Sequence, residues 1–444
     1  MSFEERLRAE ARRDSGAEWV AIEGDFDVDP DELALPAGDR FCLWDTRPRA
    51  DLAPELAVGI GASISVESEG VERGARARGE LATLRARIER RDARVRAFGG
   101  LAFEPGQRGA FGAFGDLSLL VPRWTFTETA SARRVLLVAR AAELREPEIL
   151  LEELCRVTCP VASPRRPKGA LALEDAGDRE FMRAVERAIQ AISASSLDKV
   201  VVVRRVGLRG EVAPHPVLAE LAGESGCIRF AFGRAGAVFA GATPELLVTT
   251  DGQCVRSEAV AGTESREFPP ARLLESEKDR REHEYVVRDI RARLVQEGIA
   301  LDPIRSAEVR TLRHVHHLVT PITGRASERR HALDLALALH PTPAVLGLPR
   351  ARAREFLARE ESFERGWFAS PVGWVGLDGD GAFAVALRSL LIEPGRTWLF
   401  AGAGIVQGSS PEGELRETQA KLSSALGALG SPTTPPSLSR VEQL

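Results

Sequence analysis

Residues 228–242, IRFAFGRAGAVFAGA, decide between the two fold classes open to this chain. Two runs of aromatic and small apolar residues flank the turn GRAG, which predicts a β-hairpin. A second hairpin is predicted at residues 372–392, VGWVGLDGDGAFAVALRSLLI, around DGDG. Strand-to-strand hairpins outnumber strand-helix-strand units in this half of the chain. The pattern therefore favours an α+β protein, with antiparallel sheets flanked by helices, over a doubly wound parallel sheet.

Composition and charge describe an ordinary globular protein, and a small molecule is the expected partner. The chain has 444 residues, of which 44% are hydrophobic, and a net charge of −5. An acidic balance without basic, aromatic-rich runs gives no reason to expect nucleic acid as a partner. The N-terminal MSFEERLRAEARRD is charged, and no apolar stretch approaches 18 residues. We therefore expect no membrane partner and a cytoplasmic location.

The chain divides into three parts by sequence. Residues 1–165 alternate strand-like runs with arginine-rich amphipathic segments, and we expect this variable N-terminal part of the fold to be architectural. The connection CPVASPRRPKG, at residues 159–169, is typical of a linker or exposed loop. Residues 166–430 hold the segments that carry chemistry, and residues 431–444 are predicted to be a flexible tail. Five cysteines without paired CxxC spacing indicate neither a disulfide framework nor a zinc site.

One lysine is unusual in this sequence. The chain has 60 lysines and arginines together, and Lys199 is one of only four lysines. It opens the run KVVVVRRV, which predicts a buried strand, where a plain positive charge would be costly. Its scarcity and its place single it out without assigning a role.

The segment at residues 272–295, RLLESEKDRREHEYVVRDIRARLV, predicts an amphipathic helix. Val287, Ile290 and Leu294 mark its apolar face. Glu282 lies one turn before Val286, so its carboxylate can sit at the margin of that face. A solvated charged helix is the alternative for most of its carboxylates.

The last strand and helix, at residues 397–429, offer a second set of polar groups. Gly402 and Gly404, in AGAG, allow close backbone approach to a ligand. The helix that follows places Glu414, Glu417 and Lys421 on one face, as a ligand site or as a surface ion-pair ladder. Carboxylates suit Mg²⁺, which commonly takes one or two of them and completes its shell with water and substrate oxygens.

Nine segments between about residues 195 and 425 together resemble the chorismate-utilising enzymes. They are, in order, DKVVVVRR, FAGATPELL, SEAVAGTESR, SEKDRREHEYVV, HVHHLVTPITG, LHPTPAVLGLP, ERGWFASPVGW, FAVALRSLLI and AGAGIVQGSSPEGELRETQAKL. The resemblance implies an anthranilate synthase component I-like α+β fold, with large antiparallel sheets packed together, outer helices and a deep cleft. It also implies Mg²⁺ as cofactor and chorismate, a dianion, as substrate.

The resemblance also implies roles for single residues. Arg388 would bind the enolpyruvyl carboxylate, for which a guanidinium is well shaped. The other substrate-binding residues implied are Gly262, Thr263, His317, Gly402, Gly404 and Lys421. The metal ligands implied are Glu282, Glu417 and Glu414. Phe368 and Ser370 stand where this family typically has Tyr and Gly, so a hydroxyl near the substrate is absent.

Two positions separate the sister activities of the family. Lys199 matches the general base of isochorismate and salicylate synthases, which anthranilate synthases do not have. Ala261 stands where aminodeoxychorismate synthases carry a nucleophilic lysine. The sequences of the segments SEAVAGT and LHPTPAV resemble isochorismate synthases, of menaquinone or siderophore type, more than salicylate synthases. Glu245 would be the general acid, and a monomer is expected. A non-catalytic chorismate-binding paralogue is the alternative from another class.

Overall fold

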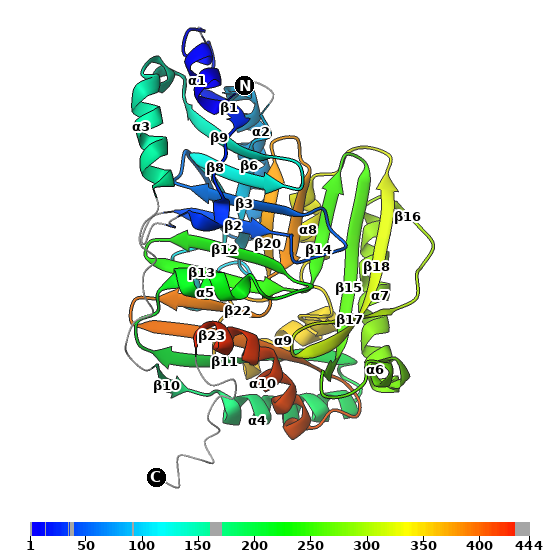
Figure 1. The fold of residues 1–444 in the computed structure, drawn as a ribbon. Coiled ribbons are helices and arrows are strands. Elements are labelled where there is room, and N and C mark those ends of the chain that lie inside the picture. Colours follow the sequence, from blue (N-terminus) through cyan, green and yellow to red (C-terminus); the bar gives the residue numbers. More distant parts are fainter. Residues whose placement is uncertain are drawn as a thin grey trace.

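The computed structural model describes residues 2–13, 15–33, 35, 40–90, 93–159 and 171–430 (Figure 1). Of the predicted connection at residues 159–169, only Cys159 lies within these ranges. The predicted tail at residues 431–444 lies outside them. Two large sheets dominate the described residues, with helices on their outer faces. All neighbouring strands run antiparallel except one short parallel pair. The predicted α+β class is confirmed.

The first sheet has 13 strands within the described residues, and they run across the view in Figure 1. In sheet order they are β10 (Ala172–Asp175), β11 (Lys199–Arg209), β23 (Arg396–Ile405), β22 (Ser389–Glu393), β13 (Ala237–Thr243), β12 (Ile228–Arg234), β2 (Phe41–Asp45), β3 (Glu55–Ile60), β8 (Trp124–Thr129), β9 (Arg133–Arg140), β1 (Trp19–Asp25) and β5 (Ile88–Glu89), with β19 (Gly347–Leu348) paired to β11.

The second sheet has 10 strands in the described part of the chain, several of which run upright at the right of Figure 1. They are β16 (Ile299–Leu301), β18 (Val315–Ala326), β15 (Cys254–Ser265), β14 (Leu246–Asp251), β21 (Gly381–Val385), β20 (Pro371–Gly376), β6 (Arg96–Leu101), β7 (Leu117–Val121) and β4 (Ile64–Ser68), with β17 (Glu308–Thr311) paired to β18.

The helices cover these sheets. They are α1 (Phe3–Glu10), α2 (Arg73–Arg87), α3 (Pro147–Thr158), α4 (Asp178–Ser193), α5 (Pro214–Leu221), α6 (Ala271–Glu275), α7 (Glu277–Gln296), α8 (Ala332–Leu339), α9 (Arg350–Glu360) and α10 (Pro411–Ala428). Helix α7 packs on β15, α10 on β23 and α4 on β11. None of the helices in the described ranges is long and apolar enough to cross a membrane.

Strands from before residue 160 complete both sheets. In the first sheet β2 pairs with β12, and in the second β6 pairs with β20. The N-terminal part therefore shares its hydrogen-bonded ladders with the rest of the chain.

The first predicted hairpin forms as β12 and β13, with Ala235 and Gly236 in its turn. Both have positive φ, 50° and 82°, as a type I′ turn requires. The second prediction is only half right. Strands β20 and β21 form a hairpin around DGDG, but residues 381–392 are not one strand. The chain leaves the second sheet after Val385 and enters the first at Ser389.

Candidate active site

Two crossings between the sheets lie side by side and carry two predicted site residues. Glu245 lies between β13 of the first sheet and β14 of the second, and Arg388 lies between β21 and β22. The Thr243 hydroxyl donates to the Val385 carbonyl at 2.6 Å, and the Val385 amide donates to the Glu245 carbonyl at 3.1 Å. The two crossings are thus hydrogen-bonded to each other, which fixes an acid and a cation at the seam of the sheets.

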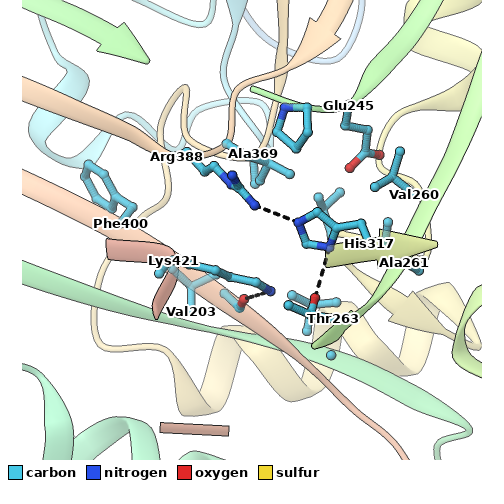
Figure 2. Close-up of a pocket in the computed structure, with 18 of the residues that line it drawn as sticks. Val203, Glu245, Val260, Ala261, Thr263, His317, Ala369, Arg388, Phe400 and Lys421 are labelled. Atoms are coloured by element: carbon cyan, nitrogen blue, oxygen red, sulfur yellow. Dashed lines mark hydrogen bonds between the residues drawn. The ribbon is translucent and has the colours of Figure 1, made fainter. Parts of the chain in front are cut away.

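A cleft of about 710 Å³ opens at this seam (Figure 2). Nine of the twelve predicted site residues line it: Glu245, Gly262, Thr263, Glu282, His317, Arg388, Gly402, Gly404 and Lys421. Apolar side chains, among them Val201, Val203 and Leu387, fill the rest of the wall. The other three lie behind the wall: Lys199 pairs with Glu282 and Glu417 with Lys421, both of which line the cleft, whereas Glu414 pairs with Lys278, which does not. The combination of an apolar wall with a few convergent polar groups is typical of a small-molecule site.

Arg388 and His317 form one wall of the cleft. The Arg388 Nη2 donates to His317 Nε2 at 2.7 Å, and His317 Nδ1 lies 3.1 Å from the Gly262 carbonyl and 3.2 Å from the Thr263 hydroxyl (Figure 2). Burial and the neighbouring guanidinium hold the pKa of His317 well below its usual value, so the ring is neutral. With Nε2 accepting, the proton sits on Nδ1 and is donated to Gly262.

Arg388 is a buried cation that lacks a counter-ion. Burial lowers the pKa of its guanidinium, and no carboxylate within the described residues pairs with it. Its backbone has a φ of +48°, which is strained for a residue with a side chain. A desolvated guanidinium held in a strained turn is well suited to bind an anion such as a substrate carboxylate.

Glu245 is a buried carboxyl group that keeps its proton. The residue is 2% exposed, and its Oε1 has no hydrogen-bond partner within the described residues. Burial, with a smaller contribution from the charge of Glu258, raises its pKa to about 8, although Lys199 and Lys421 act in the opposite direction. A protonated carboxylic acid at neutral pH can donate a proton.

Lys199 and Glu282 form a buried pair against Gly404. The Lys199 Nζ lies 2.9 Å from Glu282 Oε1, and the lysine side chain is fully buried. Burial alone would raise the pKa of Glu282, but Lys199 more than offsets this and the pKa lies below its usual value. A Cβ atom on Gly404 would come 2.2 Å from Glu282 Oε1 and 3.1 Å from Lys199 Cε. Gly404 is therefore needed for this pair to lie against the strand.

At Gly402 and Gly404, the backbone N–H and C=O groups of β23 point away from the neighbouring strand β11. Opposed residues of an antiparallel pair exchange either both hydrogen bonds or neither. Val201 and Val203 oppose Gly404 and Gly402, and their amides donate elsewhere, to the Leu346 carbonyl and to Glu361. The two glycines therefore direct their own backbone groups to the other side, where Lys421 already donates to the Gly402 carbonyl at 2.9 Å.

The remaining two lysines near the cleft pair with the other predicted metal ligands. Lys278 donates to Glu414 at 2.8 Å, and Lys421 donates to Glu417 at 2.7 Å. Glu414 reaches Lys278 from α10, so this pair joins α10 to α7. Burial, together with the charge of Glu417, raises the pKa of Glu414 to about 7, and in the described part of the chain its Oε2 has no hydrogen-bond partner.

The donor set fits a hard divalent cation that takes only part of its shell from protein. Across the described ranges no three acidic, histidine or cysteine side chains gather closely enough to form a complete ligand set. The unpartnered Oε2 of Glu414 and the like-charged Glu417 beside it nevertheless leave carboxylate oxygens available. A cation such as Mg²⁺ would draw its other ligands from water and a substrate.

Several residues near the site were not predicted. Phe368 stacks on Phe400 with ring centroids 5.0 Å apart, and both line the cleft. Phe368 had been noted only for its missing hydroxyl. Arg49 and Arg310 contact the residue before Glu245, and no sequence pattern marked either of them.

Residues 36–430 match the family of proteins described as chorismate binding enzymes. The chain belongs to this family. A Pseudomonas aeruginosa protein named salicylate biosynthesis isochorismate synthase is 35% identical, over 93% of this chain and 91% of its own length. The isochorismate synthase MenF of Bacillus subtilis is 34% identical, over 75% of this chain and 74% of its own. The predicted family is thereby confirmed.

Solved structures agree on the fold. The menaquinone-specific isochorismate synthase MenF of Escherichia coli superposes with a TM-score of 0.78 and 27% identity, covering 96% of this chain and 99% of that one. Anthranilate synthase component I of Streptococcus pneumoniae, at 19% identity, covers 85% of this chain and 92% of that one with a TM-score of 0.68. The predicted anthranilate synthase component I-like architecture is confirmed.

Proposed function

We propose that this protein is an isochorismate synthase, which isomerises chorismate by adding water at C2 and releasing the C4 hydroxyl. The observation that carries the proposal is the placement of a protonated acid, Glu245, and an unpaired cation, Arg388, at adjacent crossings on one cleft. Two relatives that match most of this chain bear the name isochorismate synthase, which supports the same activity.

Chorismate would be held by its two carboxylates. Arg388 offers a buried guanidinium for the enolpyruvyl carboxylate, and its bond to neutral His317 fixes its direction. Thr263, the backbone of the two β23 glycines and Lys421 would orient the rest of the dianion. The apolar wall excludes bulk water, which strengthens each of these contacts.

The reaction moves two protons and shifts the double bonds. Lys199 would take a proton from the attacking water as its oxygen bonds to C2. The ring double bonds shift in the allylic direction, the C4–O bond breaks, and Glu245 protonates the departing hydroxyl to give water. One water enters and one leaves, so the product is an isomer. The base then holds the extra proton and the acid lacks one, and exchange with solvent restores both.

Lysine is suited to this role where arginine is not. An arginine keeps its proton under all ordinary conditions, whereas an amine can lose one. In the structure Lys199 faces the Glu282 carboxylate, and this carboxylate is one of the proposed metal ligands. A cation held by Glu282 would compete with the Lys199 ammonium for this carboxylate.

Glu282, Glu417 and Glu414 would hold Mg²⁺. When bound, the ion would supply Lewis acidity, holding the ring carboxylate of chorismate and drawing electron density from the ring. The proposal therefore includes a requirement for the ion.

Product analysis tests the proposed function. Purified protein is incubated with chorismate and Mg²⁺, with a parallel sample in excess chelator, and the products are separated. Isochorismate in the first sample and none in the second is the expected result. Salicylate with pyruvate would instead support the salicylate synthase alternative. Unchanged chorismate would support a non-catalytic chorismate-binding protein.

A further inference from the structure

A cluster of charged side chains contacts the backbone of Pro244, the residue that precedes Glu245. The Pro244 carbonyl accepts from Arg49 Nη1 at 3.0 Å and from Arg310 Nη1 at 2.7 Å. Arg49 lies in the turn after β2 of the first sheet, and Arg310 lies on β17 of the second. One carbonyl at the crossing is thus fixed by donors from both sheets.

Both guanidiniums are in turn held by one buried carboxylate. Glu258, on β15, is fully buried and accepts from Arg49 Nη2 at 2.8 Å and from Arg310 Nη1 at 3.0 Å. Arg256 and Asp51 complete the cluster, and Arg256 donates to Glu258 at 2.9 Å. Buried charges are tolerated only when they are paired and well oriented, so this cluster restricts the two guanidiniums to one arrangement.

We propose that Arg49 and Arg310 are positioning residues for Glu245, which act by fixing the Pro244 carbonyl at the crossing. The inference rests on the proposed function, in which Glu245 protonates the leaving hydroxyl. Among the described residues, no hydrogen bond to the Oε1 atom of this acid fixes its direction, so the placement of the backbone that carries it matters. The carbonyl of Glu245 itself accepts a hydrogen bond from the Val385 amide. The carbonyl before it, of Pro244, accepts from the two arginines.

The contact matters for rate because proton transfer depends steeply on placement. A catalytic group displaced by about 1 Å can cost about 10²-fold in rate. Removal of one of two donors to Pro244 leaves the other in place. We therefore expect a kcat about tenfold lower, while the Michaelis constant for chorismate changes little because the substitution removes none of the side chains proposed to bind chorismate.

Arg256 provides a matched control. It pairs with the same Glu258 and with the same Asp51 as Arg310 does, and it is comparably exposed, at 27% against 16%. It makes no hydrogen bond to Pro244 among the described residues. Arg310→Ala and Arg256→Ala therefore remove equal charge from one cluster, but only the first removes a donor from the Pro244 carbonyl.

The experiment measures kcat and the Michaelis constant of both variants and of the unchanged protein, with chorismate-binding sites per chain counted by calorimetry. The expected result is a lower kcat for Arg310→Ala alone, at a full number of sites. Provided that the unchanged protein forms isochorismate, an equal loss of kcat in both variants, or no loss of kcat in Arg310→Ala, would overturn the inference. If the unchanged protein forms none, the proposed function fails and the inference with it.

A second pair of variants covers a failure to fold. If Arg310→Ala gives no folded protein, Arg310→Lys and Arg256→Lys answer the same question, because lysine keeps the charge beside Glu258. A lysine at 310 offers a single ammonium in place of the planar fork, so a lower kcat is expected there and not at 256. Equal kcat values for these two variants would overturn the inference.

Discussion

Raising the pH above about 8 should remove Glu245 as a proton donor. Burial raises its pKa to about 8, against an ordinary value of 4.5. An acid catalyst works in its protonated form, so the contribution of Glu245 to the rate is complete below this pKa and falls above it. At pH 9 about one acid in ten still carries its proton, and each further pH unit costs another factor of about ten. The activity should therefore have a basic limb centred near pH 8.

Initial rates of isochorismate formation at saturating chorismate, between pH 6 and 10 at fixed ionic strength, would show this limb. Glu245→Gln is the control, since an amide fills the same space but cannot protonate a leaving group. It should lose about 10²- to 10⁴-fold in kcat, and its residual rate should lack the basic limb. Several groups face this acid, including Lys199, Lys421 and Glu258. A limb below about pH 6, or one that survives unchanged in Glu245→Gln, would refute the role given to Glu245.

Three further substitutions test the geometry of β23 and of the strand beside it. Gly404→Ala would place a Cβ 2.2 Å from Glu282 Oε1, so the Lys199–Glu282 pair must move and kcat should fall by about 10²-fold. Gly402→Ala, in which the nearest contact of the new Cβ would be 3.3 Å, should lose much less. Equal losses in the two variants would contradict the steric reasoning. Lys199→Ala should abolish water addition, by about 10²- to 10⁴-fold in kcat, while calorimetry still detects chorismate binding. Full activity in that variant would exclude Lys199 as the base.

The hairpin at 228–242 could be predicted because its turn chemistry is local. Ala235 and Gly236 take up the positive φ values that the turn needs, and the flanking runs bury on both faces. The break at 386–388 could not be predicted in the same way. Residues 381–392 are apolar almost throughout, since β21 and β22 are each buried in a different sheet. A continuous apolar run does not record a change of sheet.

The Arg49 and Arg310 contacts were beyond prediction for a different reason. The hydrogen bond from Arg49 to Pro244 joins residues 195 positions apart, and its bond to Glu258 spans 209. In an arginine-rich chain a single arginine in a loop is indistinguishable from a solvated one. Only the pairing of β2 with β12 brings the N-terminal turn to the crossing. The N-terminal part, expected to be architectural, therefore reaches the neighbourhood of the proposed acid.

Three of the four lysines lie beside the proposed metal ligands. Scarcity and motif marked Lys199, but the structure adds that Lys199, Lys278 and Lys421 each pair with one of the three proposed metal ligands. Three ammonium groups thus pair with three carboxylates at this side of the cleft. A divalent cation alone would add two positive charges to a largely buried site, and a dianion alone would add two negative ones. Bound together they leave the balance unchanged, so on electrostatic grounds Mg²⁺ and chorismate should each bind more tightly in the presence of the other.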